Sequence, residues 1–207
     1  MKRTFTFLLT ALFLCVGMVK AAVTDVPEMS TEAGIKWYTI KNVRTQKYAT
    51  YAGETASMTQ QAVVQDGSLF YFTGSVADGV ATVKIHNAQA GELLCAGTNS
   101  WTAEGIDWYI AAKADNGLSI SMTADFSGTK SWNDFQGSGK TIDYWTATDA
   151  GSIWAVELFG ADIQVALDKM LARKDNPIFG EPMYSEEAYN ALAAAYETFN
   201  ANATVEN

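Results

Sequence analysis

One segment of the chain gathers the side chains that sugar recognition requires. An aromatic ring stacks on the C–H face of a sugar, while planar amide and carboxylate groups hydrogen-bond to pairs of neighbouring hydroxyls. The segment KSWNDFQGSGKTIDYW (130–145) holds both kinds, and its candidates are Trp132, Asn133, Asp134, Gln136, Asp143, Tyr144 and Trp145. Trp101, in the loop TNSWTAEG, is a further candidate. A core position for Trp132, and for one of Tyr144 and Trp145, stays open as the alternative.

Other chemistry has little support in the residues. The run GSGKT (137–141) ends like a phosphate-binding loop, but Asp134 stands where that motif needs its first glycine, so a glycine-rich hairpin tip is expected. His86 is the only histidine, and we expect it on a strand surface rather than as a metal ligand or general base. No Gly-x-Ser-x-Gly elbow or His-Glu-x-x-His pair occurs.

A glycosidase pair of carboxylates stays open, because 23 acidic residues leave many pairings. We nevertheless expect no catalytic residue in this chain, no metal site and no cofactor.

The N-terminal residues have the features of a secretory signal. Lys2 and Arg3 precede an apolar run over residues 5–19, and Val19-Lys20-Ala21 offers a cleavage site. The run is shorter than the roughly 20 residues that span a bilayer. We therefore expect a signal peptide over residues 1–21, a linker over 22–33, and a secreted, periplasmic or cell-surface protein with no membrane span after processing. An uncleaved anchor is the alternative.

Charge and cysteine content narrow the class of partner. Removal of the signal takes away three cations and moves the net charge from −9 to −12, which disfavours nucleic acid and leaves neutral glycans unaffected. Cys95 is the one cysteine outside the signal, so it has no partner for an intramolecular disulfide and is expected to be a small buried residue.

Residues 35–159 make three passes of one strand pattern. Each pass opens on an alternating strand, WYTIKN (37–42), ATVKIHN (81–87) or LSISM (118–122), and closes on an aromatic-x-apolar pair: Phe70/Phe72, Trp108/Ile110 and Trp154/Val156. Asp78-Gly79 and Asn116-Gly117 mark hairpins between passes, and Asp66-Gly67 marks another turn. Prolines are absent from the region. Three units are too few for most propellers, so the pattern predicts a mainly β domain of three pseudo-repeats, a β-trefoil.

The first pass, WYTIKNVRTQKYATYAGE (37–54), resembles the ricin-B-type lectin repeat, which opens with Tyr-x-Ile-x-Asn and closes with Gln-x-Trp. The resemblance implies a β-trefoil over residues 34–160 and a carbohydrate ligand. The sequence departs from the family where its closing glutamine belongs, because Ser68, Ile106 and Ser152 stand there, and the family's sugar-binding aspartate has no clear counterpart. The resemblance therefore supports the fold more strongly than the ligand.

The pattern becomes helical after Phe159. In GADIQVALDKMLARKD, apolar residues from Ile163 to Leu171 follow a helix face, and a second helix is expected from Ser185, with Glu186 and Glu187 in its first turn. This tail is similar to the helical spacer repeats of large secreted bacterial glycan-degrading proteins. We expect residues 161–207 to be such a spacer that lacks its third helix; a genuine two-helix C-terminus is the alternative.

Together these patterns predict a mainly β protein, a β-trefoil with a C-terminal two-helix α segment. The expected function is a secreted, non-catalytic carbohydrate-binding or adhesion module at a bacterial cell surface, forming the N-terminal part of a larger glycan-degrading protein and contacting its other domains. One alternative is a protein-interaction or spacer module with no sugar site. Another is the accessory region of an enzyme, a glycoside hydrolase or protease, whose catalytic domain lies beyond residue 207.

Overall fold

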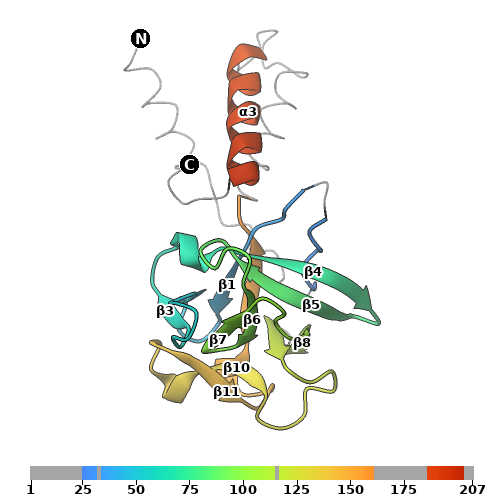
Figure 1. Ribbon diagram of the computed structural model, residues 1–207, viewed down its shortest axis with the longest axis vertical. Coiled ribbons are helices and arrows are strands. Elements are labelled where there is room, and N and C mark those ends of the chain that lie inside the picture. Colours follow the sequence, from blue (N-terminus) through green and yellow to red (C-terminus); the bar gives the residue numbers. More distant parts are fainter. Residues whose placement is uncertain (1–24, 32–33, 115–116, 161–185, 203–207) are drawn as a thin grey trace, which may run out of the picture. The chain divides into compact units, whose positions relative to one another are not determined.

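A computed structural model describes residues 25–31, 34–114, 117–160 and 186–202 (Figure 1). The described strands belong to one compact unit, and helix α3 as far as Thr198 belongs to another. The unit that contains the strands is called the β unit below.

Six of the described strands close into a barrel. They are β1 (Tyr38–Asn42), β4 (Phe70–Ala77), β5 (Val80–Asn87), β8 (Trp108–Ala114), β9 (Gly117–Ser121) and β12 (Trp154–Leu158). Each pairs antiparallel with the next, and β12 pairs back with β1. Closure gives every strand of the ring a hydrogen-bonded neighbour on both sides.

Three short hairpins complete the β unit. They are β2 (Tyr48–Thr50) with β3 (Thr59–Gln61), β6 (Leu94–Gly97) with β7 (Ser100–Thr102), and β10 (Ser131–Asp134) with β11 (Ile142–Trp145). Backbone hydrogen bonds join the hairpins to one another. The Met58 N–H donates to the Thr98 carbonyl at 2.6 Å, and the Ile142 N–H donates to the Met58 carbonyl at 3.0 Å. Side chains at the hairpin ends are thereby brought together from distant parts of the sequence.

The three passes expected from the sequence match this architecture. Their opening strands are β1, β5 and β9, and their closing strands are β4, β8 and β12. The closing aromatic-x-apolar pairs are all buried. In the core, the Trp132 ring lies edge-to-face against Trp108 (centroids 5.5 Å apart) and Trp154 (6.3 Å), a favourable arrangement of aromatic quadrupoles.

The asparagine of the Ile-x-Asn motif has a structural role. The Asn42 amide donates to the Gly151 carbonyl, and the Asn87 amide donates to the Gly67 carbonyl, each at 2.8 Å. Gly67 and Gly151 lie in the short 3-10 turns η1 (Asp66–Ser68) and η3 (Ala150–Ser152), which precede closing strands. Each asparagine thus fastens the start of one pass to the end of another.

The predicted turns are confirmed within the described residues. Asp78 (φ 52°) and Gly79 (φ 76°) both have positive φ in the turn between β4 and β5, as a tight hairpin requires. Asp66-Gly67 lies in η1, and GSGKT lies at the end of the β10–β11 hairpin. Asn116 lies outside the described residues.

Helix α3 (Glu186–Asn202) begins directly after Ser185, with Glu186 and Glu187 in its first turn, as expected. The first predicted helix, near residues 163–171, lies outside the described residues. No helix in the described part of the chain is long and apolar enough to cross a membrane.

Candidate functional site

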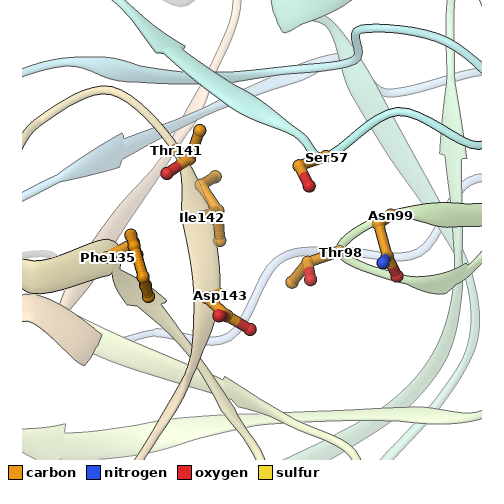
Figure 2. Close-up of a pocket in the computed structure, with 7 residues that line it drawn as sticks. All are labelled: Ser57, Thr98, Asn99, Phe135, Thr141, Ile142 and Asp143. Carbon is orange, nitrogen blue, oxygen red and sulfur yellow. The ribbon is translucent and has the colours of Figure 1, made fainter.

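A hollow of about 250 Å³ opens where the ends of the three hairpins meet (Figure 2). Its lining comes from the approach to β3, from the β6–β7 turn, and from the β10–β11 hairpin: Ser57, Thr98, Asn99, Phe135, Thr141, Ile142 and Asp143. In Figure 2 the β11 residues lie between Phe135 on one side and the Thr98–Asn99 turn on the other. The hollow therefore depends on the folding of all three passes.

The β11 strand presents alternate residues to the two sides of its hairpin. Ile142 is buried, whereas Asp143 is exposed in the hollow, and Trp145 follows two residues later, 52% exposed. Residues two apart share a strand face, so Trp145 lies roughly 7 Å along the strand from Asp143 on that same face. One face of β11 thus carries a carboxylate and an exposed aromatic ring.

Neighbouring backbone groups orient the polar side chains of this hairpin. One carboxylate oxygen of Asp143 accepts the Tyr144 N–H at 2.9 Å, which leaves its other oxygen for a ligand. The Tyr144 hydroxyl accepts the Thr98 N–H at 2.9 Å and so joins β11 to the β6–β7 turn. Burial raises the pKa of the Tyr144 phenol above its ordinary value.

Phe135 and Asn99 are site residues that the sequence did not reveal. Phe135 begins the short turn η2 (Phe135–Gly137), lines the hollow and is 40% exposed. Asn99 is exposed in the β6–β7 turn. A signal was present for Asn99, since asparagine in a loop such as TNSWTAEG is typical of turns, whereas no comparable signal marked Phe135.

Four predicted site residues serve the interior instead. The predicted sugar-stacking role is wrong for Trp132 (0% exposed) and Trp101 (1%), because both rings lie in the core. Asn133 and Asp134 are also buried, and their polar groups hydrogen-bond to other parts of the protein. The Asn133 amide donates to Asp149 at 2.9 Å and to Ser152 at 3.0 Å.

The buried position of Trp132 follows from the strand register. Ser121 pairs with Ser131 as His86 pairs with Leu94, so Ser131 corresponds to Leu94 and Trp132 corresponds to the buried Cys95. Residues one apart on a strand face opposite sides, so this register places the Trp132 ring in the interior, the core position that the sequence left open as the alternative.

The other predicted residues lie at or beside the hollow. Asp143 lines it, Tyr144 supports it through Thr98, and Trp145 shares the outward face of Asp143. Gln136 is exposed in the adjoining loop but does not line the hollow.

The family's closing-glutamine position is structural here. The Ser68 hydroxyl, fully buried, hydrogen-bonds to the Thr50 hydroxyl at 2.8 Å, and Ser152 accepts the Asn133 amide. Both serines join a hairpin to the turn before a closing strand, so neither offers a polar group to a ligand.

His86 is more buried than the surface position we expected. Its ring stacks on Tyr71 with centroids 4.1 Å apart, and its Nε2 hydrogen-bonds to the Thr73 hydroxyl at 2.9 Å. Burial lowers the pKa of His86. Among the described residues, no group of three His, Cys, Asp or Glu side chains is placed to hold a metal ion.

The lining of the hollow combines one exposed ring, one carboxylate, one amide and several hydroxyl groups, and no cation is among the lining residues. These groups suit a neutral polyhydroxylated ligand, which the ring can stack on and the polar atoms can hydrogen-bond. Asp143 is the one carboxylate in the lining, whereas glycoside hydrolysis requires a pair.

Comparison with known proteins gives distant structural likenesses. No family model matches the chain, and no curated protein matches it. Among solved structures, the Rhizoctonia solani agglutinin is 17% identical with a TM-score of 0.49, over 64% of this chain and 99% of that one. The GlcNAcα1-4Gal-releasing endo-β-galactosidase of Clostridium perfringens is 13% identical with a TM-score of 0.47, over 59% of this chain. That match spans 32% of the enzyme, about a third of its length.

Proposed function

We propose that the β unit is a β-trefoil that acts as a non-catalytic carbohydrate-binding or adhesion module. The observation that carries this proposal is the convergence of Phe135, Asp143 and Asn99 on one hollow from two different hairpins. Binding residues held by a rigid scaffold at the ends of its loops are a common arrangement for recognition.

The strand pairing supports the trefoil part of the proposal. A closed six-stranded ring with three hairpins, each hairpin following an opening strand, is what three four-stranded units produce. The equivalent pairings Lys41–Tyr48, His86–Leu94 and Ser121–Ser131 repeat the same connection in each unit.

The chemistry of the hollow supports binding without catalysis. A sugar ring resting on Phe135 would present one hydroxyl to the free oxygen of Asp143 and a neighbouring pair to the planar Asn99 amide. Trp145 extends the same face and offers a second ring to a longer glycan. Release of sugar from any glycan by this chain alone would overturn the non-catalytic assignment.

The cellular setting is proposed from the sequence. We propose a signal peptide over residues 1–21, a secreted, periplasmic or cell-surface location, and a helical spacer over residues 161–207. On this proposal the chain forms the N-terminal part of a larger glycan-degrading protein. Sequencing the gene beyond codon 207 and determining the N-terminus of the exported protein test these points.

A glycan array tests the binding function directly. The full chain is compared with three variants, Asp143→Asn, Phe135→Ala and Trp145→Ala, across neutral and acidic glycans. We expect a neutral glycan to bind, and Asp143→Asn and Phe135→Ala each to weaken it about tenfold or more, since each removes a contact worth about 1–2 kcal/mol.

Matched controls separate the site from general effects. Asp78→Asn changes an exposed aspartate in the β4–β5 turn, and Val76→Ala shortens an exposed apolar side chain. Both are expected to bind as the wild type does. If the wild-type chain binds none of the glycans, the proposal is wrong and a protein-interaction or spacer module is favoured.

A further inference from the structure

The residue directly before Phe135 is a buried carboxylate with an unusual set of donors. Asp134 is fully buried and accepts Arg44 Nη2 at 2.9 Å, Gln60 Nε2 at 2.8 Å and the Gly139 N–H at 2.7 Å. The three donors come from three separate segments of the chain. A buried carboxylate needs such partners, since desolvation without them is costly.

Two cationic side chains from the first pass hydrogen-bond to the loop that begins at Asp134. Arg44 also donates to the Asp134 carbonyl at 3.2 Å, and the Lys47 ammonium donates to the Gly139 carbonyl at 2.7 Å. Both cations lie in the turn between β1 and β2, about ninety positions away in the sequence. The ends of the 134–139 loop are therefore fixed from outside the loop.

The backbone of this loop needs that support. Three residues of the loop have left-handed backbone conformations: Gln136 (φ 52°), Gly137 (φ 68°) and Gly139 (φ 59°). This conformation is energetically costly for the glutamine, whereas glycine adopts it as readily as other backbone conformations. Inside the loop, the Phe135 N–H donates to Thr141 and the Ser138 N–H donates to Phe135, each at 3.0 Å. The Gly139 N–H bond to the Asp134 carboxylate closes the loop, and Arg44 holds the other oxygen of that carboxylate.

We infer that Arg44 and Lys47 are positioning residues of the hollow. Neither is among the lining residues, but they hold the 134–139 loop so that the Phe135 ring is already set for a ligand. A pre-set ring gains affinity because binding does not have to order the loop. The inference rests on the proposed function, as it assigns two cations of the first pass a part in placing a ring of the third.

A measurement on the unliganded full chain tests the positioning itself. Backbone ¹⁵N order parameters of residues 135–139 are compared among the wild type, Arg44→Met, Lys47→Met and Lys84→Met. We expect them to fall in Arg44→Met and Lys47→Met. Lys84→Met is the matched control, because it removes a cation whose ion-pair partner is Asp107 (3.1 Å) and not a residue of this loop. Unchanged order parameters in the two test variants would overturn the inference.

A double-mutant cycle tests the consequence for binding. With the glycan that binds the wild type, Arg44→Met is expected to weaken binding about tenfold, and Arg44→Lys to recover part of that loss, since the cation is retained. In the Phe135→Ala background, Arg44→Met is expected to have no further effect, because the ring it positions is gone. An equal loss with and without Phe135 would show that Arg44 acts by another route and overturn the inference.

The two proposals can fail separately. A wild-type chain that binds no glycan sinks the proposed function, while the order parameters still decide the positioning role. Arg44→Met leaves a buried carboxylate short of one donor and can unfold the chain. In that case Lys47→Met, which leaves Asp134 with all its donors, decides the question by the same measurement.

Discussion

At the scale of single residues, buried polar side chains of the β unit mainly hydrogen-bond separate segments of the chain to one another. Asn87 is buried, donates to the Gly67 carbonyl, and accepts the Gln89 N–H at 2.9 Å. Asn87→Ala leaves both backbone groups without these partners, and we expect it to lower the free energy of unfolding by about 2–3 kcal/mol. Urea denaturation measures this. Glu92→Ala, at an exposed position, should change it by less than about 0.5 kcal/mol, and equal losses in the two variants would contradict the assigned role.

Tyr38 gives the β unit a dependence on alkaline pH. Its side chain is buried, its hydroxyl accepts the Glu28 N–H at 3.0 Å, and burial raises its pKa from the ordinary 10.0 to about 12. A raised pKa means that the folded state holds the proton more tightly than the unfolded state does. The associated stability is therefore fully present below pH 10 and is lost as the pH rises through about 12.

The variant Tyr38→Phe tests this assignment, because it cannot ionise at that position. We expect urea midpoints of the wild type to fall more steeply between pH 10 and 12 than those of Tyr38→Phe. Other tyrosines titrate in both proteins and cancel in the difference. Parallel pH profiles would count against the assignment.

At the scale of elements, the β4–β5 hairpin depends on a close backbone approach. A Cβ at Gly74 (φ 148°) would lie 2.1 Å from the Thr82 carbonyl oxygen on the facing strand, whereas a Cβ at Gly79 would meet nothing within 4 Å. Gly74→Ala is therefore expected to destabilise the β unit by about 2 kcal/mol or more, because the two strands must separate.

Gly79→Asn is the matched control in the same hairpin, since asparagine tolerates the positive φ of that turn. It should cost less than about 1 kcal/mol. Thermal melts of both variants provide the comparison, and a larger loss for Gly79→Asn would refute the steric explanation.

At the scale of the whole β unit, the closed ring and shared tryptophan core predict one cooperative unfolding transition. All six tryptophans lie between Trp37 and Trp154, so their fluorescence reports the β unit alone. Trp154 Nε1 donates to the Trp132 carbonyl at 3.0 Å, and Trp154→Phe loses this bond along with buried ring volume. We expect a loss of about 2–3 kcal/mol, seen equally by fluorescence and near-UV circular dichroism.

Trp145→Phe is the control for that variant, because Trp145 is exposed and its loss of ring volume leaves no cavity. Trp145→Phe should leave the unfolding midpoint nearly unchanged by both fluorescence and near-UV circular dichroism. Transitions that separate between the two probes would show that the passes unfold independently.

The sequence by itself determined the strand pattern of this protein. The three opening strands, the three closing pairs and the Asp78-Gly79 turn depend on neighbours in the chain, through side-chain alternation and through positive φ at turn residues. The second helix, α3, was predictable for the same reason, from its first-turn acids and its apolar spacing.

Only the tertiary structure decided which aromatic rings meet solvent. Trp132 and Phe135 are three residues apart, yet one is the centre of the core and the other lines the hollow. The difference depends on a strand register and on a loop held by cations from another pass, both of which are set by contacts between residues far apart in sequence. Local periodicity contains no information on such contacts, so it located the segment that carries the site, with Asp143 in it, but not which aromatic ring lines the hollow.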